Sequence, residues 1–192
     1  IGIIGSGQMG GAVGLKWAQV GHQIFFSSRN PDRLADLVAE AGPNAQAGLP
    51  NAAARFGEVV LIAVPYGALP QVGRDYGPLM QGKVVIDLGN PREDRDGPMA
   101  ADAIARGTGV TSAEYLPGVR LVRALSAISF TQVRDGPRTP ERIGVPIAGD
   151  DTAAVEIATR LVEDAGFDPV LVGSLARARE FDRGTEVYVR GM

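Results

Sequence analysis

Short apolar runs alternate along this chain with longer stretches that have helical periodicity. Two runs, within Glu58–Val64 and Lys83–Leu88, are apolar without alternation, which is typical of strands that are covered on both faces. The strands expected in the first half are Ile1–Ile4, Gln23–Ser27, Glu58–Val64 and Lys83–Leu88, and the helices between them are Gln8–Val20, Pro31–Ala41 and Ala68–Met80. Strands that alternate with helices of this length predict βαβ units. We therefore expect an α/β fold with a doubly wound, mostly parallel sheet.

The pattern changes after Asn90. Pro91–Pro98 is charged and rich in turn formers, so we expect a surface loop there. The later elements expected are a helix over Ala100–Leu116 that breaks near Gly107, a strand over Arg120–Leu125, and a β–α–β unit made of Gly144–Ala148, Asp151–Ala165 and Asp168–Val172. No element is assigned between Ser126 and Arg142. The sequence shows no internal repeat. It also contains no linker that would separate two independent domains.

The amino-acid composition excludes several kinds of catalytic and metal site. The 192 residues include 26 Gly, one His and no Cys, which excludes disulfides, thiol catalysis and Cys-ligated metals and leaves no basis for a His-rich metal site. The formal net charge of −3 offers no basic footprint for nucleic acid. The apolar start, Ile1–Ile4, is far shorter than the ~20 residues of a membrane span, and no basic leader precedes it. We expect a soluble cytoplasmic protein with neither nucleic-acid nor membrane partners.

A glycine-rich loop carries the strongest chemical signal. Its residues, Gly5, Ser6, Gly7, Gln8, Met9 and Gly10, match G-x-G-x-x-G directly after an apolar strand and at the start of a helix. Gly5 would allow the tight turn, Gly7 the close approach of a pyrophosphate, and Gly10 close packing of helix on strand. The helix N-terminus would offer its free N–H groups to the phosphates. The alternative is a tight strand–helix turn without a ligand.

The end of the second strand indicates which dinucleotide binds. Sites for NAD place an Asp or Glu there, about 20 residues after the loop, to bind the ribose 2′-hydroxyl. In this chain no acidic residue follows the strand until Asp32. Ser28 and Arg29, with Arg33 one turn further on, would instead bind the 2′-phosphate of NADP. The alternative is that these arginines are only solvated side chains of a loop.

Two more strand ends are expected at the same crevice. The first ends with Ala63, Val64 and Pro65, and the second is followed by Asn90. These residues are candidates to line the nicotinamide half of the site, and Asn90 would hydrogen-bond the amide or the ribose. The alternative is that each X-Pro pair simply ends its strand. For Tyr66, which follows Pro65, we expect a packing role.

Three groups of residues resemble a known family, the coenzyme F420-dependent NADP oxidoreductases. They are Ile3–Gly10, Ser27–Asn30 with Ala63–Tyr66, and the C-terminal segments Pro146–Asp151, Ala165–Val170 and Val172–Arg179. The segments keep the family's order over nearly the whole chain. The oxidoreductase domains of the STEAP metalloreductases and, more remotely, the pyrroline-5-carboxylate reductases are similar in the first half.

The resemblance implies a Rossmann domain for NADP(H) over residues 1–125 and a small C-terminal α/β lobe over 126–192 that shapes the second substrate's pocket and a homodimer contact. It also implies hydride transfer between NADP(H) and a small-molecule redox acceptor, coenzyme F420 or a flavin. Such transfer passes directly between two stacked rings, so no catalytic acid or base is expected.

One segment differs from the family's pattern and leaves the identity of the hydride acceptor open. Archaeal members of the family often carry a His in the segment that corresponds to residues 124–129, and STEAP-like relatives have Asn-Thr-Ile, whereas this chain has Ser126-Ala127-Ile128. Two other functions remain. One is reduction of a small imine or carbonyl compound, which the missing large helical C-terminal domain disfavours. The other is a non-catalytic module that binds or senses NADPH.

Overall fold

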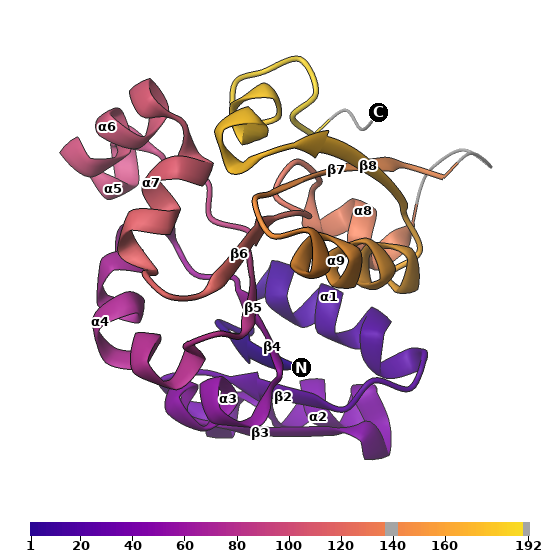
Figure 1. Cartoon of the computed structure of the whole chain (residues 1–192). Coiled ribbons are helices and arrows are strands. Elements are labelled where there is room, and N and C mark those ends of the chain that lie inside the picture. The colour runs from indigo at the N-terminus through magenta and orange to yellow at the C-terminus, as the bar shows by residue number, and fades with distance from the viewer. Residues whose placement is uncertain (137–141, 190–192) are drawn as a thin grey trace.

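The computed structural model describes residues 1–136 and 142–189, and within them eight strands form one sheet (Figure 1). The spatial order is β3-β2-β1-β4-β5-β6-β7-β8, and every pair is parallel except β6–β7. The strands are β1 (Gly2–Ile4), β2 (Ile24–Ser27), β3 (Ala45–Gly48), β4 (Val59–Ile62), β5 (Val84–Asp87), β6 (Arg120–Arg123), β7 (Gly144–Gly149) and β8 (Asp168–Gly173). The expected doubly wound, mostly parallel α/β fold is confirmed.

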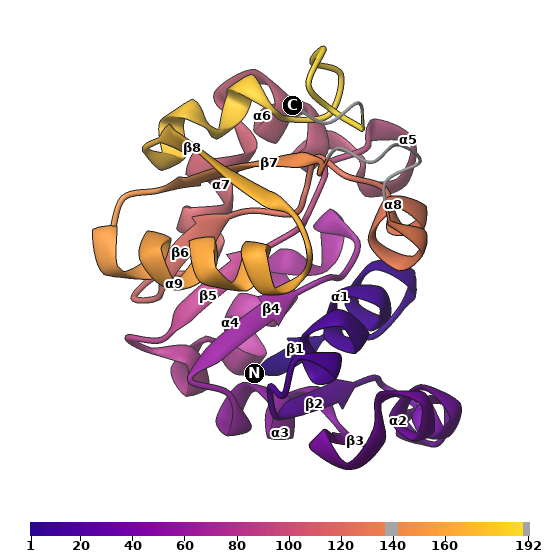
Figure 2. The same cartoon turned by 90° about the vertical axis from the view of Figure 1, so that its right-hand side faces the viewer.

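Helices cover both faces of this sheet. The α-helices are α1 (Gln8–Gln19), α2 (Ala35–Ala41), α3 (Pro50–Phe56), α4 (Leu69–Met80), α5 (Glu93–Asp96), α6 (Pro98–Arg106), α7 (Thr108–Tyr115), α8 (Phe130–Asp135) and α9 (Thr152–Asp164). Short 3-10 turns span Pro31–Leu34, Gly42–Asn44, Tyr66–Ala68 and Leu175–Glu180. Figure 2 shows α1, α8 and α9 across one face, and Figure 1 shows α4 and α7 on the other. No described helix is long and apolar enough to cross a membrane.

Alternate residues of the central strands form two separate cores. Ile3 of β1 and Leu61 of β4 point to the face of α1 and pack in one cluster with Trp17. Their neighbours Ile4 and Ile62 pack on the opposite face, against α3, α4 and α7. This is the period-2 geometry of a strand that is buried on both sides, so the unbroken apolar runs are explained.

Several predicted boundaries are confirmed by local geometry. The helix expected over 100–116 is split at Gly107, whose φ of +101° separates α6 from α7. The side chain of Asp151 accepts a hydrogen bond from Ala154 N at 2.8 Å and so caps α9. A paired hydrogen bond from Arg120 is the main reason that the pKa of Asp151 falls to about 2.

The sequence pattern missed two elements near the edge of the sheet. The strand β3 is made of Ala45-Gln46-Ala47-Gly48, which carries no β-branched or aromatic residue and therefore no strand signal. It forms only because β2 offers a free edge with which it pairs in parallel register. The helix α3 follows it with Pro50 at its first turn, a favourable position for proline.

A short helix lies in the segment expected to be a surface loop, and another lies in the stretch to which no element was assigned. Pro91–Pro98 holds α5, because the Asp96 side chain accepts a hydrogen bond from Arg92 N at 3.0 Å and closes a single turn. The unassigned stretch after Ser126 holds α8, which begins with a reciprocal capping box between Ser129 and Gln132. Asn30 precedes the 3-10 turn Pro31–Leu34, but its side chain makes no capping hydrogen bond.

The C-terminal unit β7–α9–β8 extends the same sheet through the antiparallel β6–β7 pair. The Trp17 indole Nε1 also donates to the carbonyl of Leu161 at 2.7 Å, which joins α1 to α9 across the expected division. The division of the chain at residues 125/126 stays a prediction.

Two helical glycines give a matched test of this packing. A Cβ at Gly14 would overlap the ring of Phe26 and lie 2.6 Å from Cδ1 of Ile3, whereas a Cβ at Gly77 would meet no atom within 4 Å. We expect Gly14→Ala to lower the free energy of unfolding by about 1–3 kcal/mol through overpacking. Gly77→Ala should raise it by up to about 1 kcal/mol through helix propensity. Urea unfolding measures both, and equal effects of the two variants would contradict this packing.

Candidate dinucleotide-binding site

The glycine-rich loop joins β1 to α1 and is fastened to the next strand. Ser6 N donates to the carbonyl of Ser27 at 3.0 Å, and Ser27 N donates to Ser6 Oγ at 2.9 Å. Gly5 has a φ of +94°, a conformation that L side chains rarely adopt. The loop is therefore held in one shape by the strands on which it sits.

The three motif glycines lie in three different environments. A Cβ at Gly5 would come within 2.7 Å of the Ala63 carbonyl oxygen, and one at Gly10 would overlap the carbonyl of Gly5. A Cβ at Gly7 would instead meet nothing within 4 Å, so its outer side is open. Gly7 is also the N-cap of α1 and provides no side-chain cap, which leaves first-turn N–H groups to be satisfied from outside. This geometry fits the approach of an anion such as a pyrophosphate.

The loop lies where the strand order reverses. β1 pairs with β2 on one side and with β4 on the other, and all three run in parallel. In doubly wound sheets the crevice beyond the carboxyl ends of such strands is the usual ligand site. The loop after β1 and the segment after β4 both open onto it.

The predicted residues after β2 are accessible. Arg29 and Arg33 are exposed, and neither is ion-paired within residues 1–136 and 142–189. Ser28 is half-buried, and its hydroxyl accepts a hydrogen bond from Asn30 N at 3.1 Å. Two guanidinium groups are thus free for a ligand at this end of the crevice.

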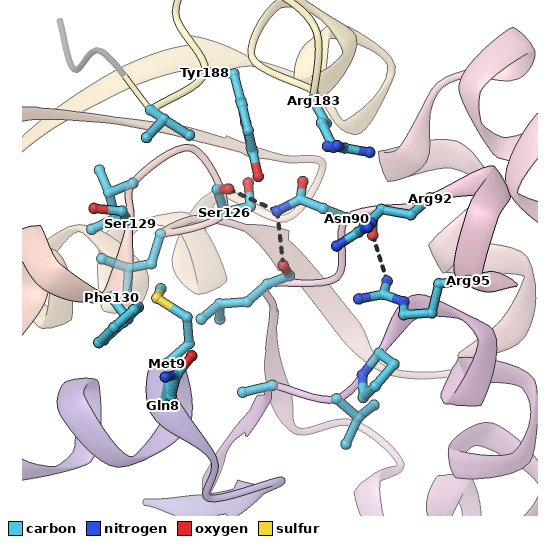
Figure 3. Close-up of a pocket in the computed structure, with 17 residues that line it drawn as sticks. Gln8, Met9, Asn90, Arg92, Arg95, Ser126, Ser129, Phe130, Arg183 and Tyr188 are labelled. Atoms are coloured by element: carbon cyan, nitrogen blue, oxygen red, sulfur yellow. Dashed lines mark hydrogen bonds between the residues drawn. The ribbon is translucent and has the colours of Figure 1, made fainter.

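A cavity of about 550 Å³ lies at the other end. Six predicted residues line it: Gln8, Met9, Ala63, Val64, Pro65 and Asn90. Gly5, Ser6, Gly7, Gly10, Ser28, Arg29 and Arg33 do not line it. The remaining walls come from the segments that follow β5 and β6 and from the C-terminal segment (Figure 3). Tyr66 is buried beneath, with its hydroxyl 2.7 Å from Thr111 Oγ1, and so has the packing role expected for it.

Two buried polar atoms in the cavity wall have no hydrogen-bond partner among residues 1–136 and 142–189. Asn90 donates from Nδ2 to the Ser126 carbonyl at 2.8 Å, which orients the amide, but its Oδ1 has no partner. The hydroxyl of Ser126 is likewise unpartnered. The preceding residue, Leu125, has a φ of +59°, a strained conformation of the kind that clusters at functional sites. Buried polar atoms without partners are costly, so these two mark a place for a polar ligand group.

A cationic wall of the cavity was not identified from the sequence. It consists of Arg92, the N-cap residue of α5, Arg95 within that helix, and Arg183 in the C-terminal segment. Figure 3 shows these arginines on one side of the cavity, opposite Met9 and Phe130. Arg95 donates to the Asn90 carbonyl at 2.9 Å. The charged run after Asn90 indicated that Arg92 and Arg95 lie near the strand end. Nothing in the sequence around Arg183 indicated that this residue would lie beside them.

Beneath the cavity lies a buried ion pair that sequence reasoning also missed. Arg123 Nη1 is 2.9 Å from Asp87 Oδ2, and both side chains have 0% exposure. The same guanidinium donates to the Gly89 carbonyl at 2.6 Å, while Gly89 N donates to Asp87 Oδ1 at 2.7 Å. Ser112 donates to Asp87 as well. These bonds fix the turn that presents Asn90.

The remaining titratable groups offer little other chemistry. Among the described residues no cluster of three or more His, Asp or Glu could hold a metal ion. His22 pairs with Asp164 at 2.7 Å and does not line the cavity. What the site presents is an open phosphate loop, two free arginines and a cavity with unpartnered polar atoms.

Comparison with known proteins agrees with this geometry. Residues 1–91 match the sequence model of the family described as NADP oxidoreductase, coenzyme F420-dependent. The predicted resemblance is confirmed over these residues. The family is one of NADP-dependent oxidoreductases.

Relatives extend the likeness beyond residue 91. Metalloreductase STEAP3 of Rattus norvegicus is 30% identical over 189 residues, which cover 95% of this chain and 35% of that protein. The chain thus spans about a third of the length of that metalloreductase.

Two solved structures share the fold. A hypothetical protein, SMa0349, from Sinorhizobium meliloti has a TM-score of 0.84 at 22% identity, with 99% of this chain and 93% of that chain covered. A proposed F420-dependent NADP-reductase from Arthrobacter sp. FB24 has a TM-score of 0.76 at 23% identity, with 92% and 86% covered.

The buried pair can be tested against an exposed one on the same strand. We expect Arg123→Met to lower the free energy of unfolding by about 3–5 kcal/mol, because it leaves the Asp87 carboxylate buried without its charge partner. Arg120→Met breaks a partly exposed pair with Asp151 and should cost much less, because solvent screens that pair. Denaturant titration at neutral pH compares them, and a similar loss in both variants would contradict the structural role of Arg123.

Proposed function

We propose that this protein is an oxidoreductase that binds NADP(H) and transfers a hydride between it and a deazaflavin, such as coenzyme F420, or a flavin-like acceptor. The observation that carries the proposal is a crevice with an open phosphate loop at Gly7, free arginines at one end and a polar-lined cavity at the other. The family description and the names of the relatives support the same chemistry.

The residues present fit such a cofactor along the whole crevice. The first turn of α1 would receive the pyrophosphate beside Gly7. Arg29 and Arg33 would bind the 2′-phosphate, with no acidic residue before Asp32 to repel it. The unpartnered Asn90 Oδ1 would accept a hydrogen bond from the nicotinamide carboxamide. When bound, the nicotinamide supplies the hydride.

The cavity beside Asn90 suits a planar acceptor. Met9 and Phe130 provide apolar surface on one side, and Ile128 also lines the cavity. The protein's part in the reaction is to hold two rings in contact and to keep solvent out, which requires no proton transfer by a side chain. The homodimer expected from the resemblance stays a prediction.

Arg29 tests the choice of nucleotide. We expect Arg29→Ala to raise the NADPH dissociation constant about 10- to 100-fold through loss of charge-assisted hydrogen bonds, and to leave that for NADH within about twofold. Fluorescence titration with both nucleotides measures this. Arg55→Ala removes another exposed arginine, in α3, and serves as the control. Equal affinity of the native protein for NADPH and NADH would refute the NADP assignment.

Gly7 tests the phosphate loop independently of charge. Its φ of −80° suits alanine and a Cβ meets no atom, so Gly7→Ala should leave the free energy of unfolding within about 0.5 kcal/mol of the native value. NADPH binding should still weaken at least about tenfold, because the methyl group occupies the space that the pyrophosphate needs.

Gly10→Ala is the structural counterpart. Its Cβ would overlap a backbone oxygen, so this variant should lose stability rather than affinity alone. Unchanged NADPH affinity in Gly7→Ala would mean that the nucleotide does not bind at this loop. Turnover of NADPH with F420 or a flavin tests the redox activity itself.

A further inference from the structure

The hydride transfer proposed above gives the hydroxyl of Tyr188 no role. Tyr188 lines the larger cavity and also a second one, of about 390 Å³, that shares this residue with it. Its ring packs against an apolar cluster that includes Ala127 and Phe181. Figure 3 shows its side chain pointing from the C-terminal segment toward Ser126 and Asn90. The fold therefore holds this phenol with its polar end toward the cavity wall.

Two hydrogen bonds bring Tyr188 and Ser126 to the same place. Val189 N donates to the Ala127 carbonyl at 2.6 Å. Tyr188 precedes the donor of this bond, and Ser126 precedes its acceptor. Asn90 Nδ2 donates to the Ser126 carbonyl at 2.8 Å. The Ser126 hydroxyl is 3% exposed and has no partner in the described part of the chain, so Tyr188 does not satisfy it. Two hydroxyl groups that do not bond to each other thus lie in the wall beside Asn90.

Positively charged side chains share the cavity with Tyr188. The pKa of Arg92 lies above its usual value, mainly because of its hydrogen bond with Asp94, and Tyr188 adds an electrostatic contribution. Arg183 lines both cavities, as Tyr188 does, and has no ion pair within residues 1–136 and 142–189. A guanidinium beside the phenol is therefore available for an anionic group of a ligand.

Resting on the proposed binding of NADP(H), we propose a second activity for this site, the reduction of a small 2-oxo acid with Tyr188 as the proton donor. The carbonyl oxygen of the substrate would lie between the hydroxyls of Ser126 and Tyr188, which are both able to donate. Its carboxylate would accept the parallel N–H donors of Arg183. The two groups are neighbours in a 2-oxo acid, as Tyr188 and Arg183 are neighbours in the walls of both cavities.

The reaction balances with groups that the site provides. The carbonyl carbon gains the hydride that NADPH supplies, and the π electron pair of the C=O bond moves to the oxygen. That oxygen takes the proton of Tyr188, while the Ser126 hydroxyl donates a hydrogen bond to it. The phenolate regains a proton from solvent, so the products are NADP+ and a 2-hydroxy acid. Since a flavin or deazaflavin ring needs no proton from a side chain in the proposed transfer, only the reduction of the oxo acid depends on Tyr188.

Binding can be tested without turnover. Oxamate has the shape and charge of a small 2-oxo acid but is not reduced, and it is titrated into the NADP+-saturated protein by calorimetry. We expect Arg183→Gln to weaken oxamate binding about tenfold, because a bidentate charge-assisted hydrogen bond is lost. Arg179→Gln removes the same charge from an exposed position that lines neither cavity, and should bind oxamate as the native protein does. No binding to the native protein, or equal weakening in both variants, overturns the inference.

Turnover of Tyr188→Phe separates the two reactions. NADPH oxidation is measured with pyruvate and glyoxylate as oxo acids and with F420 and FMN as ring acceptors. Loss of the proton donor should lower kcat for the oxo acids about 100-fold or more, with a much smaller change in KM, so the ratio of oxo-acid to ring-acceptor turnover falls with it. Tyr76→Phe removes the hydroxyl of a tyrosine in α4 that lines neither cavity, and should keep the native ratio.

The outcomes distinguish this activity from the proposed function. Equal losses with both kinds of acceptor in Tyr188→Phe would mean that the tyrosine only maintains the cavity wall, which contradicts its role as proton donor. Turnover of F420 or FMN without any reduction of an oxo acid by the native protein also refutes the second activity. Reduction of an oxo acid without turnover of a ring acceptor contradicts the proposed flavin or deazaflavin acceptor instead, and leaves the role of Tyr188 standing.

Discussion

The ion pair between Asp87 and Arg123 is the interaction on which the rest of the site depends. Both side chains are withdrawn from water, and two such charges are tolerated only when nearly every donor and acceptor around them is satisfied. Asp87 is surrounded by Arg123, Ser112 and the backbone of Gly89, so the carboxyl end of β5 has one arrangement. The turn to Asn90, and with it the unpartnered Oδ1 in the cavity, follows from that constraint.

The Arg123 guanidinium also connects segments that are far apart in the sequence. Through Asp182 it reaches the C-terminal segment, which also bonds to the start of α7. The cavity walls therefore come from the loop after β1, the ends of β4, β5 and β6, and residues 183–189. The polar cluster of Asp87 and Arg123 therefore holds both the turn that presents Asn90 and the segment that carries Arg183.

Much of this architecture was predictable because its signals are local. Apolar runs of strand length, Gly107 between two helices and Asp151 at a helix start each act through their own neighbours. The edge strand β3 had no such signal, since it forms by pairing with β2, and the capping box of α8 was visible in the sequence but overlooked. At the site, Ala63, Val64, Pro65 and Asn90 were predicted because residues after the carboxyl ends of parallel strands lie at the same edge of the sheet. Arg183 and Tyr188 were not, because they reach the cavity from the other end of the chain.

The sequence by itself determined the alternation of strands and helices, the phosphate loop and the acid-free end of β2, since each depends on residue types at short spacing. Only the tertiary structure decided which charges are buried and which are free. Arg120 and Arg123 lie on one strand and look alike in sequence, yet one is partly exposed beside Asp151 and the other is sealed against Asp87. Likewise Arg92, Arg95 and Arg183 are residues of one type, and packing pairs Arg92 and Arg95 with neighbouring carboxylates but gives Arg183 no ion pair in the described part of the chain. Burial and pairing depend on contacts between distant segments, which spacing along the chain does not encode.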